Sequence, residues 1–429
     1  MADDQFHAFI VQTDIPPEKD GILSGYTVSL KDAIWVKDIE STATSDILRS
    51  FRPVEHSTVA KRILESGGRI IGKTVQDAFG FGSYGTHVGH GYEKPLNPYD
   101  TSRAAGGSSG GAAVAAASIK DHIAIAESTG GSIVTPAAFC GVVGFCPTYG
   151  RVSRYGLISY ASSLDKIGVM GKGVEETAIG LQAIAGKDAK DETCIPMEGE
   201  KYISKEPAFD KMIGVLHFDG VDEQIQKRCD TIIGKLKEKG ATIKEIDLPF
   251  TKKYALSAYY VIAMSEASTH LACLSGLRYG QAGDLQKTYN EYFTDVRTRH
   301  FNKETKRRAL LGTFTRMSGY RGKYYVKALK VRKKIMDEYT SIFSDVNAII
   351  MPTVPTIAPQ FDEIDKMSPA QELLFDFLTV GPNIAGLPHM SIPIQQEGEL
   401  PYGIMIVGKH LSEPELISIG KGIEVVRDE

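Results

Sequence analysis

The sequence predicts an α/β fold: a three-layer α/β/α sandwich around one large mixed β-sheet, with a helical insertion. Short apolar runs typical of buried strands alternate with helical runs, and glycines separate them, which is the rhythm of a layered α/β protein. Predicted strands return after a helical stretch that ends near residue 345, so both halves of the chain contribute to the sheet. We therefore interpret residues 1–429 as a single domain.

The first part of the chain supplies two strands and a helix. Residues 1–20 are expected to form a weakly structured lead-in segment. The alternating, β-rich run Gly25–Leu30 predicts a strand, and Lys31 stands at its end. A helix is expected over Ser57–Glu65, followed after two glycines by a buried strand over Arg69–Gly72.

The middle of the chain begins with a long loop rich in Gly, Tyr and Pro, Phe79–Asp100, and loops of this length often carry function. An Ala-rich helix is expected over Ala112–Ser118 and a buried strand over His122–Ala126. Val174–Ala185 predicts an amphipathic helix. The charged stretch 186–209 is interpreted as a loop and as the best candidate for a boundary.

A second set of strands and helices follows this loop. The mostly helical region Tyr254–Asp345 is interpreted as the insertion, at 254–345. Around it we expect strands at Met212–Phe218, Ala241–Ile246, Asn347–Met351, Met390–Ile394 and Tyr402–Val407, and helices at Asp222–Lys239 and Glu413–Val426.

Composition excludes several classes of protein. The net charge of −4 and a pI near 6.2 argue against a strong nucleic-acid surface on this chain, and the most basic run, Lys303–Arg308, is interpreted as a solvated helix face. Five scattered cysteines without metal spacing favour a reducing, cytoplasmic setting. An acidic start without an apolar segment predicts no signal peptide, and no apolar run approaches the ~20 residues of a membrane span.

The stretch most indicative of chemistry contains two serines in separate glycine contexts. Ser108 lies in the run GGSSGG, and Ser132 follows Thr129, Gly130 and Gly131. Glycine allows the backbone to approach a ligand closely, and a run of N–H groups at such a turn can hold a developing oxyanion. This combination predicts an acyl-transfer site with a nucleophile, backbone donors and a second hydroxyl, although a glycine turn with capping serines alone would look similar.

No base accompanies these serines in the sequence. His122 precedes a predicted strand, while His87 and His90 lie in the long loop and lack a third ligand motif, so no metal site is expected. The alternative is a lysine kept neutral by burial, for which Lys31 at its strand end is the candidate. Ser108 would then pass the proton of Ser132 to Lys31, although a lysine at a strand end is more often a surface residue.

Two other kinds of site are set aside. The loop Gly106–Gly111 is not a phosphate-binding P-loop, because Ala112 stands where that motif needs Lys. Cys140 lies in an apolar run, where an inert core thiol is the usual interpretation.

The two serine motifs and Lys31 before Asp32 together resemble the amidase signature family, over nearly the whole chain. The resemblance implies that family's fold and a Ser-cisSer-Lys triad. In that triad Ser132 is the nucleophile, Ser108 the bridging acid and base, and Lys31 the base. No metal is implied.

Within this family, further motifs resemble the glutaminase (A) subunits of glutamyl-tRNA(Gln) amidotransferases, which are carbon–nitrogen ligases with glutamine as amido donor. These motifs are Pro147–Gly156, Ser162–Asp165, Tyr259 and Tyr260, Ser265–Ser268, Arg278–Gly280, Arg308–Thr313 and Asn383–Pro388. The resemblance implies that Arg308 binds the α-carboxylate of glutamine, Asp376 its α-amino group, and that Tyr259 lines the pocket. A zwitterion needs one cationic and one anionic partner, which agrees with this pair.

The same resemblance implies a partner. In such complexes the ammonia passes to a B subunit that binds tRNA and uses ATP and Mg²⁺ to convert Glu-tRNA(Gln) to Gln-tRNA(Gln), and a small C subunit is present in part of the family. No cofactor is implied for this chain itself. The alternative function is a stand-alone amidase acting on other small amides.

Two positions depart from the family pattern. Ser128 and Val134 stand where the family usually has an Asp before the nucleophile turn and an Arg after the nucleophile. Since both members of a probable ion pair are absent together, we expect the turn to be supported in a different way.

Overall fold

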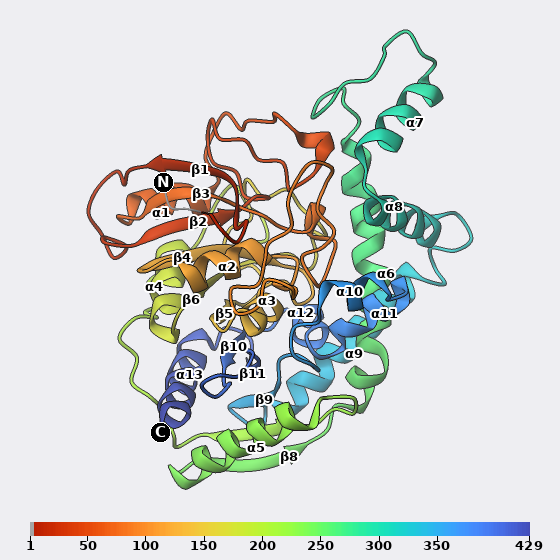
Figure 1. Ribbon diagram of the computed structural model, residues 1–429. Coiled ribbons are helices and arrows are strands. Elements are labelled where there is room, and N and C mark those ends of the chain that lie inside the picture. The colour runs from red at the N-terminus through yellow and green to blue at the C-terminus, as the bar shows by residue number, and fades with distance from the viewer. Residues whose placement is uncertain (1–3) are drawn as a thin grey trace.

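The computed structural model describes residues 4–429 and is dominated by one 11-stranded sheet with the strand order β1-β3-β2-β4-β6-β5-β10-β11-β9-β7-β8 (Figure 1). The strands are β1 (Phe9–Ile15), β2 (Thr27–Lys31), β3 (Arg69–Thr74), β4 (His122–Ser128), β5 (Val143–Cys146), β6 (Lys166–Gly171), β7 (Met212–Leu216), β8 (Thr242–Ile246), β9 (Ala348–Pro352), β10 (His389–Pro393) and β11 (Gly403–Gly408). The sheet is mixed: β2 runs parallel to β3 and β4, the strands from β4 to β9 pair antiparallel, and β7 is parallel to β8 and β9.

Helices cover both faces of this sheet. They are α1 (Thr58–Glu65), α2 (Gly110–Ser118), α3 (Val134–Phe139), α4 (Val174–Ile184), α5 (Glu223–Glu238), α6 (Pro249–His270), α7 (Tyr289–His300), α8 (Lys303–Arg316), α9 (Tyr325–Ile342), α10 (Phe361–Asp365), α11 (Pro369–Leu374), α12 (Val380–Ile384) and α13 (Glu413–Asp428). Helices α1, α4, α5 and α13 pack on one face, and α2, α3 and the α6–α9 group lie on the other. The three-layer α/β/α sandwich is therefore confirmed.

Alternation along the central strand β4 shows how these layers form. Ile123 and Ile125 point into the core under α1 and α4, whereas Ala124 and Ala126 face the alanines of α2. Successive side chains of a strand point to opposite faces, and the small residues let α2 approach the sheet closely. The start of α2, which carries the Ser108 turn, is thereby held against the end of β4.

The helical insertion runs from α6 to α9, and α7 stands away from the body of the molecule (Figure 1). Most predicted elements agree with the structure to within a few residues. No element interrupts the loop 186–209, which joins α4 to β7. Within residues 4–429, no helix is both long enough and apolar enough to cross a membrane.

The expectation that residues 1–20 form a weakly structured lead-in is wrong for part of the segment that the structure describes. Phe9–Ile15 forms β1, which pairs antiparallel with β3 at the edge of the sheet. The strand is only half-buried and contains Gln12, Thr13 and Asp14, so it lacks the apolar pattern of the inner strands. Pairing with β3, which lies far along the chain, is what orders it. Residues 1–3 lie outside the described part.

Two parallel neighbours, β2 and β4, bring the candidate site together. They pair in register from Thr27 with His122 to Leu30 with Ile125, so their carboxyl ends lie side by side. Lys31 ends the first strand, and Glu127 and Ser128 end the second. The Lys31 side chain thus meets the residues around the nucleophile turn.

Candidate active site

Lys31 and Ser108, which are 77 residues apart in the sequence, are in direct contact. Lys31 Nζ donates to Ser108 Oγ over 2.7 Å, and both side chains are fully buried. The candidate base, which no motif next to the serines revealed, therefore lies beside one of them. The alternative interpretation of Lys31 as a surface residue at a strand end is wrong.

Glu127 is the other partner of this lysine. Lys31 Nζ donates to the Glu127 backbone oxygen over 3.0 Å and to its carboxylate Oε2 over 2.9 Å. Together with Ser108 Oγ, these acceptors match the three N–H donors that a lysine side chain can offer. Glu127 is itself buried, so the pair is shielded from the solvent that weakens surface ion pairs.

The loop that carries Ser108 is held from both sides. The peptide bond Gly107–Ser108 is cis, the conformation that the family resemblance implies for this serine. Ser109 Oγ donates to the Glu127 backbone oxygen over 3.0 Å. The N–H of Asp77 donates to the Ser108 backbone oxygen over 3.1 Å, and the N–H of Gly107 donates to the Ser83 oxygen over 2.8 Å. The side chain that receives the lysine's hydrogen bond therefore has little freedom.

Ser132 lies on the turn between β4 and α3 and differs from Lys31 and Ser108 in one respect. Its exposed fraction is 7 %, whereas those of the other two are 0 %, so Ser132 is the member that a substrate can reach. A hydrogen bond between Ser108 and Ser132 is not formed in the described chain. A bridging role for Ser108 therefore requires the two hydroxyls to meet once substrate is bound, because such bonds often tighten only in the complex.

The backbone at this turn has N–H groups that form no hydrogen bond in the described chain. The N–H groups of Gly130 and Gly131 find no acceptor within residues 4–429, although both residues are buried. Buried backbone N–H groups without a partner are rare, and a pair of them at a turn forms a site for negative charge. A Cβ at Gly131 would collide with the side chain of Thr379, so the turn requires glycine there.

Asn383, on α12, supports this turn from behind. Its Nδ2 donates to the backbone oxygens of Gly130 and Thr379, and Ser128 Oγ donates to its Oδ1 over 3.4 Å. Val134 is fully buried in the core on that side. The hydroxyl of Ser128 and the apolar side chain of Val134 thus stand where the family pattern has a charged pair, and neither leaves an unpaired charge.

Thr129 connects the turn to two carboxyl groups. Its hydroxyl lies 2.8 Å from Glu127 Oε1 and 3.0 Å from Asp165 Oδ1. A hydroxyl has one proton, so it can donate to only one of them at a time. Burial, followed by the nearby Glu127 charge, raises the pKa of Asp165 to about 7. In its protonated form Asp165 can supply the missing hydrogen.

Arg308 lies on the inner side of α8 and is also buried. Its Nε donates to Glu304 Oε1 over 2.7 Å, and its Nη1 donates to the hydroxyl of Tyr160. The guanidinium stacks over the rings of Phe81, Tyr160 and Tyr260 at 5.2–5.7 Å from their centroids. Nη2 has no partner in the described residues, which leaves one edge of the guanidinium available to an anion.

Asp376 provides the opposite charge in the same region. Its Oδ2 accepts hydrogen bonds from Tyr260, over 2.5 Å, and Ser83, over 2.9 Å. Within the described chain no donor reaches its Oδ1. Burial raises the pKa of the Asp376 carboxyl, while Tyr260, Ser83 and the Arg308 charge act to lower it. Arg308 and Asp376 do not pair with each other, so each keeps an atom free for a ligand.

Tyr259 completes the surroundings of the turn. It is buried, its ring contacts that of Tyr260, and a Cβ at Gly130 would fall against its hydroxyl. Most of the sequence-derived residues are therefore linked: Lys31 and Ser108 are bonded, and Thr129 bonds Glu127, the other partner of Lys31. Tyr259, Arg308 and Asp376 are connected through the Tyr160 and Tyr260 rings.

The alternative bases and nucleophiles do not reach this site. Burial lowers the pKa of His122 to about 3, and its two ring nitrogens bond Thr27 and Ser29 at 2.8 Å. His87 pairs with Glu372, and the described residues contain no group of His, Cys, Asp and Glu that could hold a metal. Burial raises the pKa of the Cys140 thiol, which agrees with an inert core residue.

Comparison with known proteins agrees with this geometry. A family model described as amidase matches residues 8–417. The chain belongs to the amidase family. It is 41% identical to the A subunit of a glutamyl-tRNA(Gln) amidotransferase from Methanospirillum hungatei over 98% of this chain and 97% of that protein. It is 40% identical to the protein of the same name from Halobacterium salinarum over 97% and 99% of the two chains.

A solved structure is similar over nearly the same length. It is the crystal structure of the glutamyl-tRNA(Gln) amidotransferase A subunit from Thermotoga maritima, 33% identical, with a TM-score of 0.82 over 97% of this chain and 86% of that one. The resemblance seen in the two serine motifs is thus confirmed, and this chain is an enzyme of the amidase family.

Glu127 and Tyr160 are residues that sequence reasoning did not single out. Glu127 could have been noticed as the one acidic residue of a buried strand, close before the glycine turn. Asn383 begins the motif Asn383–Pro388, but the sequence gives it no role, since its partners Gly130 and Ser128 lie more than 250 residues away.

We predict that Glu127→Gln lowers kcat for amide hydrolysis about tenfold or more and changes KM by less than about threefold. A carboxylate accepts hydrogen bonds from Lys31 and Thr129 on its two oxygens, whereas an amide presents a donor to one of them. Steady-state kinetics measures this, with Glu238→Gln on the exposed side of α5 as the matched control. An unchanged kcat, or an effect confined to KM, would exclude a positioning role for Glu127.

Proposed function

We propose that this chain is the glutaminase subunit of a glutamyl-tRNA(Gln) amidotransferase. The observation that carries the proposal is the buried contact of Lys31 Nζ with Ser108 Oγ, together with Arg308 and Asp376, which both contact Tyr260. The names of the relatives from Methanospirillum hungatei and Halobacterium salinarum support it.

In the first step, Ser132 Oγ attacks the side-chain amide carbon of glutamine. Its proton passes to Ser108 Oγ, whose own proton passes to Lys31 Nζ. For this Lys31 must enter the step uncharged, and the ammonium that forms on Nζ lies 2.9 Å from Glu127 Oε2, which can accept a hydrogen bond from it.

The tetrahedral intermediate carries its negative charge on the former amide oxygen. The unpaired N–H groups of Gly130 and Gly131, together with the backbone of Thr129, are the donors that we assign to it. One such donor contributes about 3 kcal/mol in known cases. Collapse of the intermediate returns the proton through Ser108 to the leaving nitrogen, ammonia departs, and a glutamyl ester remains on Ser132.

Water then completes the reaction. The leaving ammonia vacates its place beside Ser108, and a water molecule there loses its proton along the same route as it attacks the ester. Breaking the ester restores the hydroxyl of Ser132 and releases glutamate. The two half-reactions therefore use one set of residues in opposite directions.

Recognition of glutamine would depend on the atoms of Arg308 and Asp376 that have no hydrogen-bond partner within residues 4–429. Arg308 Nη2 would bind the α-carboxylate, and Asp376 Oδ1 would bind the α-ammonium. Tyr259 would lie along the side chain between them and the turn. A simple aliphatic amide has neither charge, so it would leave Arg308 Nη2 and Asp376 Oδ1 without a hydrogen-bond partner, which is costly.

The ammonia would pass to a B subunit that binds tRNA, uses ATP and Mg²⁺, and converts Glu-tRNA(Gln) to Gln-tRNA(Gln). In this proposal ATP and Mg²⁺ bind to the B subunit and not to this chain.

The test compares substrates. Ammonia release from glutamine, measured with the purified B subunit of the same organism present, should exceed release from acetamide or propionamide by about 100-fold or more in kcat/KM. Ser132→Ala should abolish release from every amide while the complex still forms. A preference for the simple amides would instead identify a stand-alone amidase.

A second prediction concerns pH. Because the pKa of Asp376 is raised, its carboxylate is lost at a higher pH than the ordinary value near 3.9, and glutamine affinity should fall as the pH decreases through that range. Asp376→Asn should raise KM about 10- to 100-fold at neutral pH and remove this dependence. Measuring KM from pH 4.5 to 8 checks both. A variant that keeps the wild-type profile would show that another group binds the ammonium.

A further inference from the structure

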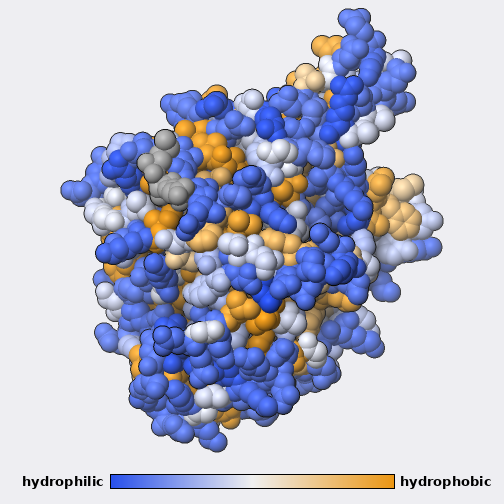
Figure 2. Space-filling view, viewed as in Figure 1, coloured by the Kyte–Doolittle hydropathy of each residue, from blue (hydrophilic) through white to orange (hydrophobic). Residues whose placement is uncertain are grey.

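The outer side of α8 and the turn after it expose a group of apolar residues, which we call the α8 surface: Leu310, Phe314, Met317, Tyr320 and Tyr324. Leu310 is 73 % exposed and Met317 51 %, and the spacing of the first three residues places them on one side of the helix. Figure 2 shows apolar residues gathered over this part of the molecule. Single exposed apolar residues are common, but a contiguous group indicates an interface.

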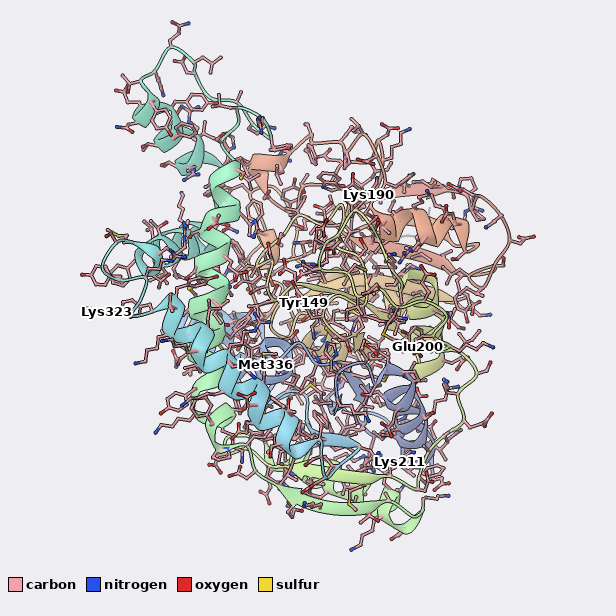
Figure 3. All side chains as sticks on the ribbon, turned by 180° about the vertical axis from the view of Figure 1, so that it is seen from behind. Tyr149, Lys190, Glu200, Lys211, Lys323 and Met336 are labelled. Carbon is pink, nitrogen blue, oxygen red and sulfur yellow. The ribbon has the colours of Figure 1, made fainter. Side chains whose placement is uncertain are left out.

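Positive charge surrounds this surface. From residue 305 to residue 336 the sequence has eleven lysines and arginines and no aspartate or glutamate, in a chain whose net charge is −4. Arg321, Lys323 and Lys327 are exposed, and none of them pairs with a carboxylate in the described chain. Lys323 lies at the outer edge of the molecule (Figure 3). A partner that covers the apolar group would therefore gain from acidic residues around its own apolar patch.

The arrangement favours a protein over a nucleic acid. Leu310 and Met317 are aliphatic, and aliphatic side chains offer no face for base stacking. The aromatic rings pack on one another, Phe314 at 4.7 Å from Tyr320 and 5.5 Å from Tyr324 between centroids, so their faces are partly occupied. Met, aromatic residues and Arg are also the residue types enriched in protein interfaces.

A second copy of this chain does not fit the same surface. A two-fold contact would place the α8 surface against itself and would bring Arg321 and Lys323 of one copy against the same residues of the other. Like charges in an interface oppose association. The occupant is therefore a protein of different sequence.

The helix that presents this surface also carries Arg308 on its inner side. Gly312, one turn further along α8, lies so close to α6 that a Cβ would collide with the Met264 backbone oxygen, so the helix is held firmly against its neighbour. A partner bound to the α8 surface would lie on the helix that binds the glutamine carboxylate.

We propose that the α8 surface docks an apolar patch with an acidic rim on the B subunit that receives the ammonia. This inference rests on the proposed function. It identifies the surface of this chain that the partner covers.

The experiment measures the affinity of purified A and B subunits from the same organism by isothermal titration calorimetry. We expect Leu310→Asp with Met317→Asp to weaken binding at least about 30-fold, and Arg321→Glu with Lys323→Glu to weaken it at least about tenfold and to reduce its salt dependence. Val54→Asp and Lys120→Glu change exposed residues of the same types elsewhere and should bind as the wild type does.

Glutamine hydrolysis by each free A subunit is the folding control, since none of these residues belongs to the catalytic or binding groups. Wild-type affinity in both double variants would overturn the proposal, even where the A subunit hydrolyses glutamine. Binding of tRNA by the free A subunit that is lost in the charge variants, with B-subunit affinity intact, would overturn it in favour of an RNA surface. Failure of the wild-type pair to hydrolyse glutamine would instead contradict the proposed function.

Discussion

The interaction on which the site depends is the buried contact of one lysine with a hydroxyl and a carboxylate. Lys31 Nζ reaches Ser108 Oγ, the Glu127 carboxylate and the Glu127 backbone oxygen within 3.0 Å. Only adjacent parallel strands place these groups together, because Lys31 ends β2 and Glu127 lies at the end of β4. The loop of Ser108 and the turn of Ser132 both attach to the end of β4. The sheet thus determines the position of Lys31 relative to the loop of Ser108 and the turn of Ser132.

In the rest of the site, each buried charged side chain has its own hydrogen-bond partners. Near the turn, Ser128 and Val134 stand where the family pattern has a charged pair, and Asn383 bonds Ser128 and the Gly130 backbone oxygen, so no ion is left alone there. Arg308 forms hydrogen bonds with Glu304 and Tyr160, and Asp376 forms hydrogen bonds with Ser83 and Tyr260. Their remaining atoms stay free because the two ions do not pair with each other. That is the arrangement a zwitterionic ligand needs.

Sequence reasoning recovers what local patterns encode. Apolar alternation and glycine boundaries predict β2, β4 and α2, and two glycine motifs with Lys31 predict the residues that the structure brings together. Features that depend on distant partners are not recovered. The edge strand β1 is ordered by pairing with β3, and Asn383 reaches Gly130 across 253 positions of sequence. The interpretation of the basic run Lys303–Arg308 as a solvated helix face is wrong for its inner side, because the structure buries Glu304 and Arg308 and leaves Lys303 exposed.

The most direct test of the account is acylation of the nucleophile itself. The protein is mixed with glutamine, quenched in acid within one turnover, and digested for mass spectrometry. The account predicts a glutamyl ester on the peptide that contains Ser132 in the wild type, and none within the same time in Lys31→Ala. An ester on a different residue, or acylation of Ser132 at the wild-type rate in Lys31→Ala, would contradict it.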